Sequence, residues 1–167
     1  MLVLALAPVC GPDLDWVVGS WKGTTQGSQF LSQEVSLDAA VADGKLTLVL
    51  TRNVLIQKLV DTVVVNLETN TATTSTPYVP AHRVDHATFS NKSLQFRADP
   101  WNIGMEQPLQ LEWSLSSGRL EERPQKGRIF LAGPLLVEDA NSLVFTWNAH
   151  LDQKPLGLET ANLRRQP

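Results

Sequence analysis

Apolar and polar residues alternate along most of the chain from Gly19 onward, and convincing helical periodicity is scarce. In residues 45–52, three leucines at every second position alternate with threonine and valine. This pattern predicts a strand with one aliphatic face and one mixed face, as in a barrel wall with a packed side and a cavity side. The chain is therefore expected to be all-β.

Turn signals separate the expected strands. Asp43-Gly44 predicts a tight hairpin between strands at 30–39 and 45–52. Residues 54–76 are rich in threonine toward their end, and we favour two strands over a linker there because threonine is β-branched. The other expected strands are 19–27, 82–89, 94–98, 109–115, 120–123, 128–131, 143–151 and 158–165. Such short, regularly spaced strands favour a single closed antiparallel β-barrel of about eight to ten strands over an open sheet.

Composition limits the classes of partner. The chain has 167 residues, 43% of them hydrophobic, and a formal net charge of −3. This length fits one domain, which we place at residues 13–167. No basic patch is visible, so a nucleic-acid partner is not expected. No apolar run reaches the roughly 20 residues that a transmembrane helix needs, so a soluble domain is expected.

The first ten residues are apolar and carry no charged side chain. They resemble the hydrophobic part of a secretion signal without its basic start, which would place the protein in the periplasm or outside the cell. Lipid anchoring through Cys10 is an alternative, as is an ordered N-terminal extension (residues 1–12) that packs beneath the barrel in a cytoplasmic protein. Cys10 is the single cysteine, so an intrachain disulfide is excluded.

The segment from Asp13 to Gly23 carries the most specific motif. Its apolar start at Leu14 predicts one short helical turn, after which Gly19 lets the chain enter a strand whose Trp21 plugs one end of the barrel. Gly19-Ser-Trp21 resembles the Gly-X-Trp signature of the calycin superfamily, which contains lipocalin-like and nitrobindin-like barrels. Gly23 and Gly27 extend the resemblance toward the nitrobindin-like form Gly-X-Trp-X-Gly.

The calycin resemblance implies roles for residues near the C-terminus. In lipocalin-like barrels an arginine of the last strand packs over the first-strand tryptophan, which implies a structural role for Trp21 with Arg164 or Arg165. Nitrobindin-like barrels that bind haem use a histidine near the C-terminal end as the axial ligand. That histidine would fall near Leu158, whereas His150 lies earlier, on the expected previous strand. Haem is thus an alternative cofactor, although this sequence has no histidine at the position where the resemblance places the axial ligand.

The sequence contains no strong catalytic signature, and no catalytic residue is expected. His82 and His86 suggest a metal site, but residues four apart on a strand lie roughly 13 Å apart. Both imidazoles cannot bind one ion at that separation, so no metal site is expected. On a strand they are polar groups facing either a cavity or solvent.

Aromatic and basic residues within apolar strands are the expected lining of a ligand cavity. The expected ligand-binding residues are Arg97, Trp113, Arg128, Phe130, Phe145, Trp147 and His150. An inward-facing arginine would favour a carboxylate ligand such as a fatty acid. We therefore expect a barrel that binds or carries a small hydrophobic or amphipathic molecule. Two alternatives stay open: a nitrobindin-like haem-binding or enzymatic barrel, and a structural or interaction barrel filled by side chains.

Overall fold

The chain forms an all-β structure, as predicted. The structure is a computed structural model that describes residues 13–27, 33–54, 56–76, 79–84, 86–97, 101–102, 108–122, 134–151 and 154–167. The strands are β1 (Gly19–Gly27), β2 (Glu34–Ala42), β3 (Lys45–Val54), β4 (Gln57–Asn66), β5 (Thr71–Thr76), β6 (Val79–Val84), β7 (His86–Ser90), β8 (Ser93–Arg97), β9 (Trp101–Asn102), β10 (Pro108–Ser117), β11 (Arg119–Glu121), β12 (Leu135–Val137), β13 (Ser142–Leu151) and β14 (Lys154–Arg165).

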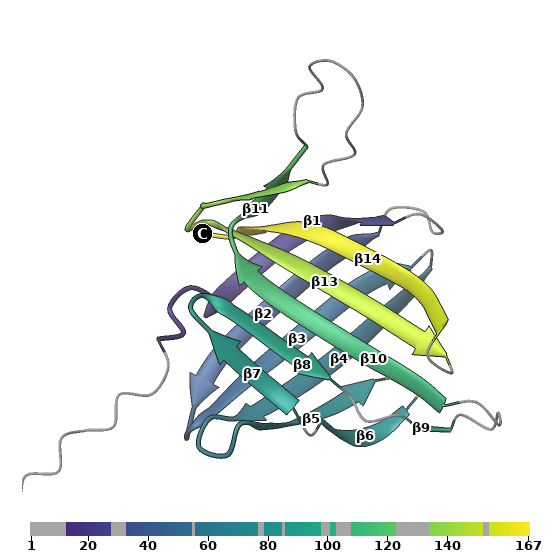
Figure 1. Cartoon of the computed structure of the whole chain (residues 1–167). Helices are drawn as coiled ribbons and strands as arrows, with labels where there is room; N and C mark the ends of the chain where they lie inside the picture. The colour runs from purple at the N-terminus through teal and green to yellow at the C-terminus, as the bar shows by residue number, and fades with distance from the viewer. Residues whose placement is uncertain are drawn as a thin grey trace, which may run out of the picture.

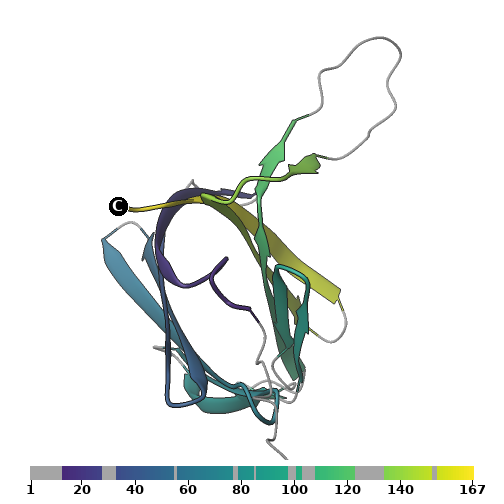
Figure 2. The same ribbon diagram turned by 90° about the vertical axis from the view of Figure 1, so that its left-hand side faces the viewer.

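The main sheet has twelve strands and curls into a nearly closed antiparallel barrel with one unsealed seam (Figures 1 and 2). Its hydrogen-bonded order is β6-β5-β4-β3-β2-β1-β14-β13-β10-β8-β7, and β9 adds to β10. The two edges, β6 and β7, are consecutive in the chain, so one polypeptide stretch borders both sides of the seam. The Ala87 amide donates a hydrogen bond of 3.2 Å to the Asn70 carbonyl, which joins β7 to the turn before β5.

Most expected strands are confirmed, with small shifts of their ends. Asp43 and Gly44 form the predicted hairpin turn, and both have the positive φ angles that such a turn requires. Residues 54–76 contain two strands, β4 and β5, as favoured over a linker. The single strand predicted at 82–89 is wrong in detail, because β6 and β7 replace it and pair with different neighbours. The strand predicted at 128–131 lies outside the described residues.

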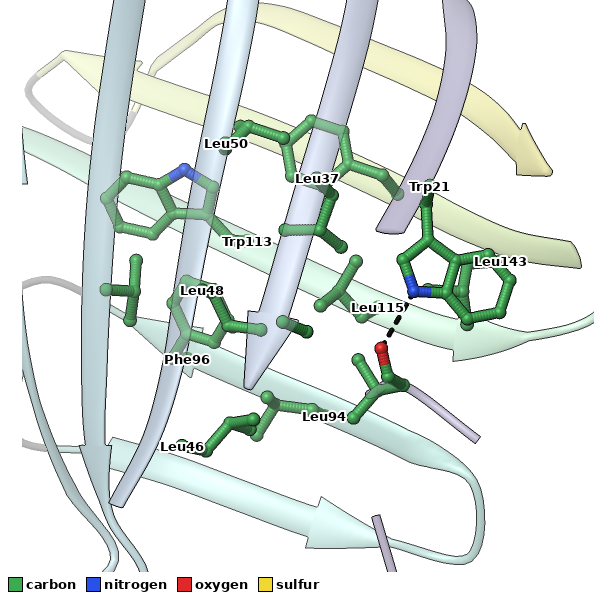
Figure 3. Packing of buried hydrophobic residues seen from close by; sticks show 14 of the residues in the cluster. Trp21, Leu37, Leu46, Leu48, Leu50, Leu94, Phe96, Trp113, Leu115 and Leu143 are labelled. Atoms are coloured by element: carbon green, nitrogen blue, oxygen red, sulfur yellow. Dashed lines mark hydrogen bonds between the residues drawn. The ribbon is translucent and has the colours of Figure 1, made fainter. Parts of the chain in front are cut away.

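One end of the barrel is plugged by Trp21 and the turn before β1. The Val18 amide donates to the Leu14 carbonyl at 3.0 Å, which forms the predicted single helical turn. Trp21 is fully buried, and its indole N–H donates to the Val17 carbonyl at 2.8 Å (Figure 3). Trp21 and the leucines of β2, β3, β8, β10 and β13 belong to one hydrophobic core.

Arg165 covers Trp21. Its guanidinium carbon lies 4.1 Å from the centre of the Trp21 ring, and Nη1 donates to the Val18 carbonyl at 2.7 Å. Assigning this role to Arg164 is wrong, because alternation along β14 leaves that side chain exposed. Gly19 makes room for the stack, since a Cβ at this position would lie 2.8 Å from Arg165 Nη1.

A short arm, formed by β11 and β12, projects from the barrel beside β13 and β14 (Figure 2). Asn162 on β14 holds the arm at its base. The Leu120 amide donates to Asn162 Oδ1 at 2.9 Å, and the Asn162 amide group donates back to the Leu120 carbonyl at 3.1 Å.

Asn162→Ala is expected to release the arm while the barrel stays folded. Each of the two hydrogen bonds contributes about 1 kcal/mol, so amide exchange at Leu120 should accelerate roughly tenfold or more. Hydrogen exchange measured by NMR or mass spectrometry would test this. Thr24→Ala is the matched control, because exposed Thr24 pairs with Asn162 from β1. Unchanged protection of Leu120 in Asn162→Ala would contradict the role of Asn162.

Candidate functional site

A charged cluster of Arg52, Asp61 and Glu159 lies inside the barrel. Arg52 follows Leu50 by two positions on β3, and Asp61 on β4 is the cross-strand partner of Leu50, so both share the interior face. Glu159 on β14 shares its face with the buried Ala161 and Leu163. It pairs with Gly27 at the far end of β1, whereas Arg165 pairs with Trp21 near the start of β1. The cluster therefore lies toward the end remote from the plug.

Arg52 bridges the two carboxylates. Its Nη2 lies 2.9 Å from Asp61 Oδ2 in a hydrogen-bonded ion pair, and its Nη1 lies 3.8 Å from Glu159 Oε2. Only 13%, 4% and 8% of the Arg52, Asp61 and Glu159 side chains are exposed. The Arg52 guanidinium also lies over the ring of Trp147, 5.5 Å from its centre. Two carboxylates and one guanidinium thus meet in a largely buried interior.

The cluster is only partly stabilised by its own charges and hydrogen bonds. Burial raises the pKa of Asp61, and this effect outweighs the attraction and hydrogen bond of Arg52, which lower it. Six buried side-chain polar atoms have no hydrogen-bond partner among the described residues, and four of them lie on the cluster and on nearby Trp113: Arg52 Nε, Asp61 Oδ1, Trp113 Nε1 and Glu159 Oε2. Buried polar groups are usually hydrogen-bonded, so four unpartnered atoms in one barrel interior indicate a place where something polar can bind.

The central interior is packed by side chains. A cavity of only about 10 Å³ remains between Asp61, Trp113 and the aliphatic residues around them. Phe96 fills much of the space beside Trp113, with ring centres 5.4 Å apart (Figure 3). Such a cavity is close to the limit of about 10–15 Å³ that one water requires. An alkyl chain does not fit between these described residues without their movement.

Three of the expected ligand-binding residues lie on the interior side of the wall. Trp113 and Phe145 are buried in the core, and Trp147 is half-buried beside it. Trp113 and Trp147 are direct cross-strand partners on β10 and β13. Trp147 in turn pairs with Glu159 on β14, which links this aromatic pair to the charged cluster.

The basic residues expected to bind the ligand, Arg97, Arg128 and His150, do not form one site among the described residues. The inward role expected for Arg97 is wrong, because alternation on β8 buries Leu94 and Phe96 and leaves Arg97 exposed. Arg97 Nε lies 3.5 Å from Glu112 Oε1, beside an outer groove of about 400 Å³. His150 is half-buried on β13 next to a register shift, and its Nδ1 has no hydrogen-bond partner among the described residues. Arg128 and Phe130 lie outside the described residues.

Sequence reasoning missed the charged cluster itself. A signal for Arg52 was present, because it continues the every-second-residue series of Leu46, Leu48 and Leu50. An arginine that extends an inward aliphatic series faces inward on a regular strand. Asp61 and Glu159 carried weaker signals, since their positions depend on how distant strands pair.

Haem does not fit the described interior. The expected ligand position near Leu158 lies on the outer side of β14, where the leucine is 54% exposed. The cavity of about 10 Å³ between Asp61, Phe96 and Trp113 is far too small for a macrocycle. A directly bound metal ion has a different requirement, and in the part of the chain that the structure describes no three metal-ligating side chains gather in a suitable cluster. The side chains of His82 and His86 lie outside that part.

The fold and the site together define a nearly closed antiparallel barrel, plugged at one end and charged inside, an architecture compatible with calycin-like barrels. Comparison of the chain with models of known protein families and with curated proteins found no match. The described segments also contain no helix of the length and hydropathy that spanning a bilayer requires.

Proposed function

We propose that this protein is a calycin-type barrel that binds a small amphipathic molecule, with the polar end of the ligand at the charged cluster. The observation that supports the proposal is the set of unpartnered buried atoms on Arg52, Asp61, Trp113 and Glu159. Natural pockets combine apolar walls with a few polar groups that fix orientation, and the aromatic pair Trp113 and Trp147 supplies such walls. Because the described cavity holds only about 10 Å³, binding requires side chains of the core to move and admit the apolar part of the ligand.

The small central cavity supports a second candidate, a structural or interaction barrel filled by its own side chains. In that case the charged cluster is internal and ordered water completes its hydrogen bonds. The two candidates differ in whether the interior accepts an organic molecule.

Native mass spectrometry of the purified protein, before and after organic extraction, separates the two candidates. A binding barrel is expected to retain a co-purified molecule or to form a saturable 1:1 complex with added 1-octanol. Trp147→Ala should weaken that complex by about tenfold through loss of apolar contact. The exposed Val41→Ala is the control. A bare mass and no saturable adduct would favour the filled barrel.

Export from the cytoplasm belongs to the same proposal. Its support is the apolar composition of residues 1–10, which lie outside the described residues. N-terminal sequencing of the mature protein from its native source would test it, since removal of this segment is expected on export.

A further inference from the structure

We infer that the ligand presents an organic cation, such as a protonated primary amine, to the charged cluster, with Glu159 as its main partner. The inference rests on the proposed function, which it makes more specific. It reverses the expectation that an inward arginine selects a carboxylate ligand.

Charge balance is the first argument. The interior arginine already serves two carboxylates, so the three charged side chains sum to −1 when both are ionised. A carboxylate ligand would bring a third anion beside Asp61 and Glu159 in an interior where charge is poorly screened. A cation instead neutralises the excess negative charge.

The unequal distances within the cluster single out Glu159. Asp61 holds Arg52 at hydrogen-bond distance, 2.9 Å, whereas Glu159 Oε2 lies 3.8 Å from Arg52 Nη1 and accepts no hydrogen bond from the described residues. Only 6% of Glu159 is exposed, so solvent does not readily donate the hydrogen bond that Oε2 lacks. An ammonium group has three donors and suits such an acceptor.

Asp61 Oδ1 and Trp113 Nε1, which are also unpartnered, lie where a water rather than the ligand can reach them. Asp61 and Trp113 both line the cavity of about 10 Å³. One water in this cavity would have both atoms as neighbours, with Trp113 Nε1 as a donor and Asp61 Oδ1 as an acceptor. Arg52 Nε is a donor and does not compete with a cation, so Glu159 Oε2 stays an open carboxylate acceptor. Its cross-strand partner Trp147 already has the Arg52 guanidinium over its ring.

Isothermal titration with three probes of equal chain length tests the inference: octylamine, 1-octanol and octanoate, near neutral pH. We expect octylamine to bind at least about tenfold more tightly than octanoate. Glu159→Gln should lower the affinity for octylamine at least about tenfold and change the affinity for 1-octanol less than about twofold. Glu112→Gln is the matched control, since it removes a carboxylate from the outer side of the barrel.

The outcomes separate the two proposals. If octanoate binds as tightly as octylamine or more tightly, the cation inference is wrong and the binding function stands. Equal loss of octylamine affinity in Glu159→Gln and Glu112→Gln would also overturn it. If none of the three probes binds the wild-type protein, the proposed function fails together with the inference. The comparison of probes on wild-type protein does not depend on the folding of any variant.

Discussion

Trp21→Ala is expected to lower the free energy of unfolding by about 3–5 kcal/mol, the range for removing a large aromatic side chain from a core. Trp21 is fully buried, donates its indole N–H to Val17 and lies under the Arg165 guanidinium. Its loss therefore removes core packing, one buried hydrogen bond and a cation–π contact. Chemical denaturation followed by circular dichroism would measure the change.

Two variants separate these contributions. Trp21→Phe keeps an aromatic ring but removes the hydrogen bond to the Val17 carbonyl, so a smaller loss of about 1–2 kcal/mol is expected. Trp16→Ala, at a half-buried position, should cost less than Trp21→Ala. A loss below about 1 kcal/mol in Trp21→Ala would show that Trp21 is not an important plug.

The plugged end of the barrel was predictable because its signals are local. Gly19 and Gly23 flank Trp21 on one strand, and each has a steric reason. Gly19 has a φ of 129° and leaves space for Arg165. A Cβ at Gly23 would collide with the backbone carbonyl of Asn162 on β14, so a bare backbone is needed where the two strands approach. Turn residues such as Asp43-Gly44 were predictable for the same local reason.

The charged cluster was not predictable to the same extent because it depends on pairing between distant strands. Leu50 and Asp61 face each other only once β3 and β4 adopt their register, and Glu159 comes from the last strand. Arg97 interrupts an apolar strand in the sequence, and this pattern predicts that it faces the cavity. On β8, however, the inward positions are those of Leu94 and Phe96, which shows that strand parity decides orientation more reliably than composition.

Arg52→Met is expected to destabilise the protein by about 3–5 kcal/mol near neutral pH, because it leaves two buried carboxylates without their shared cation. Methionine preserves much of the aliphatic part of the arginine side chain, so the loss of stability results mainly from removal of the positive charge. The variant Arg52→Met/Asp61→Asn/Glu159→Gln should recover most of the stability, since no uncompensated charge remains. Arg97→Met, at the exposed ion pair with Glu112, is the control and should change stability by less than about 1 kcal/mol.

The pH dependence identifies the cause of the Arg52→Met loss. In the wild-type protein the pKa of Asp61 is raised, so the folded state binds more protons than the unfolded state and Asp61 favours folding increasingly as pH falls. Arg52 opposes this shift, so its removal should raise the Asp61 pKa further. The stability difference between wild type and Arg52→Met should therefore narrow from about pH 7 to about pH 5, as protonation removes the uncompensated charge. A difference that stays constant over this interval would assign the loss to packing against Trp147 instead.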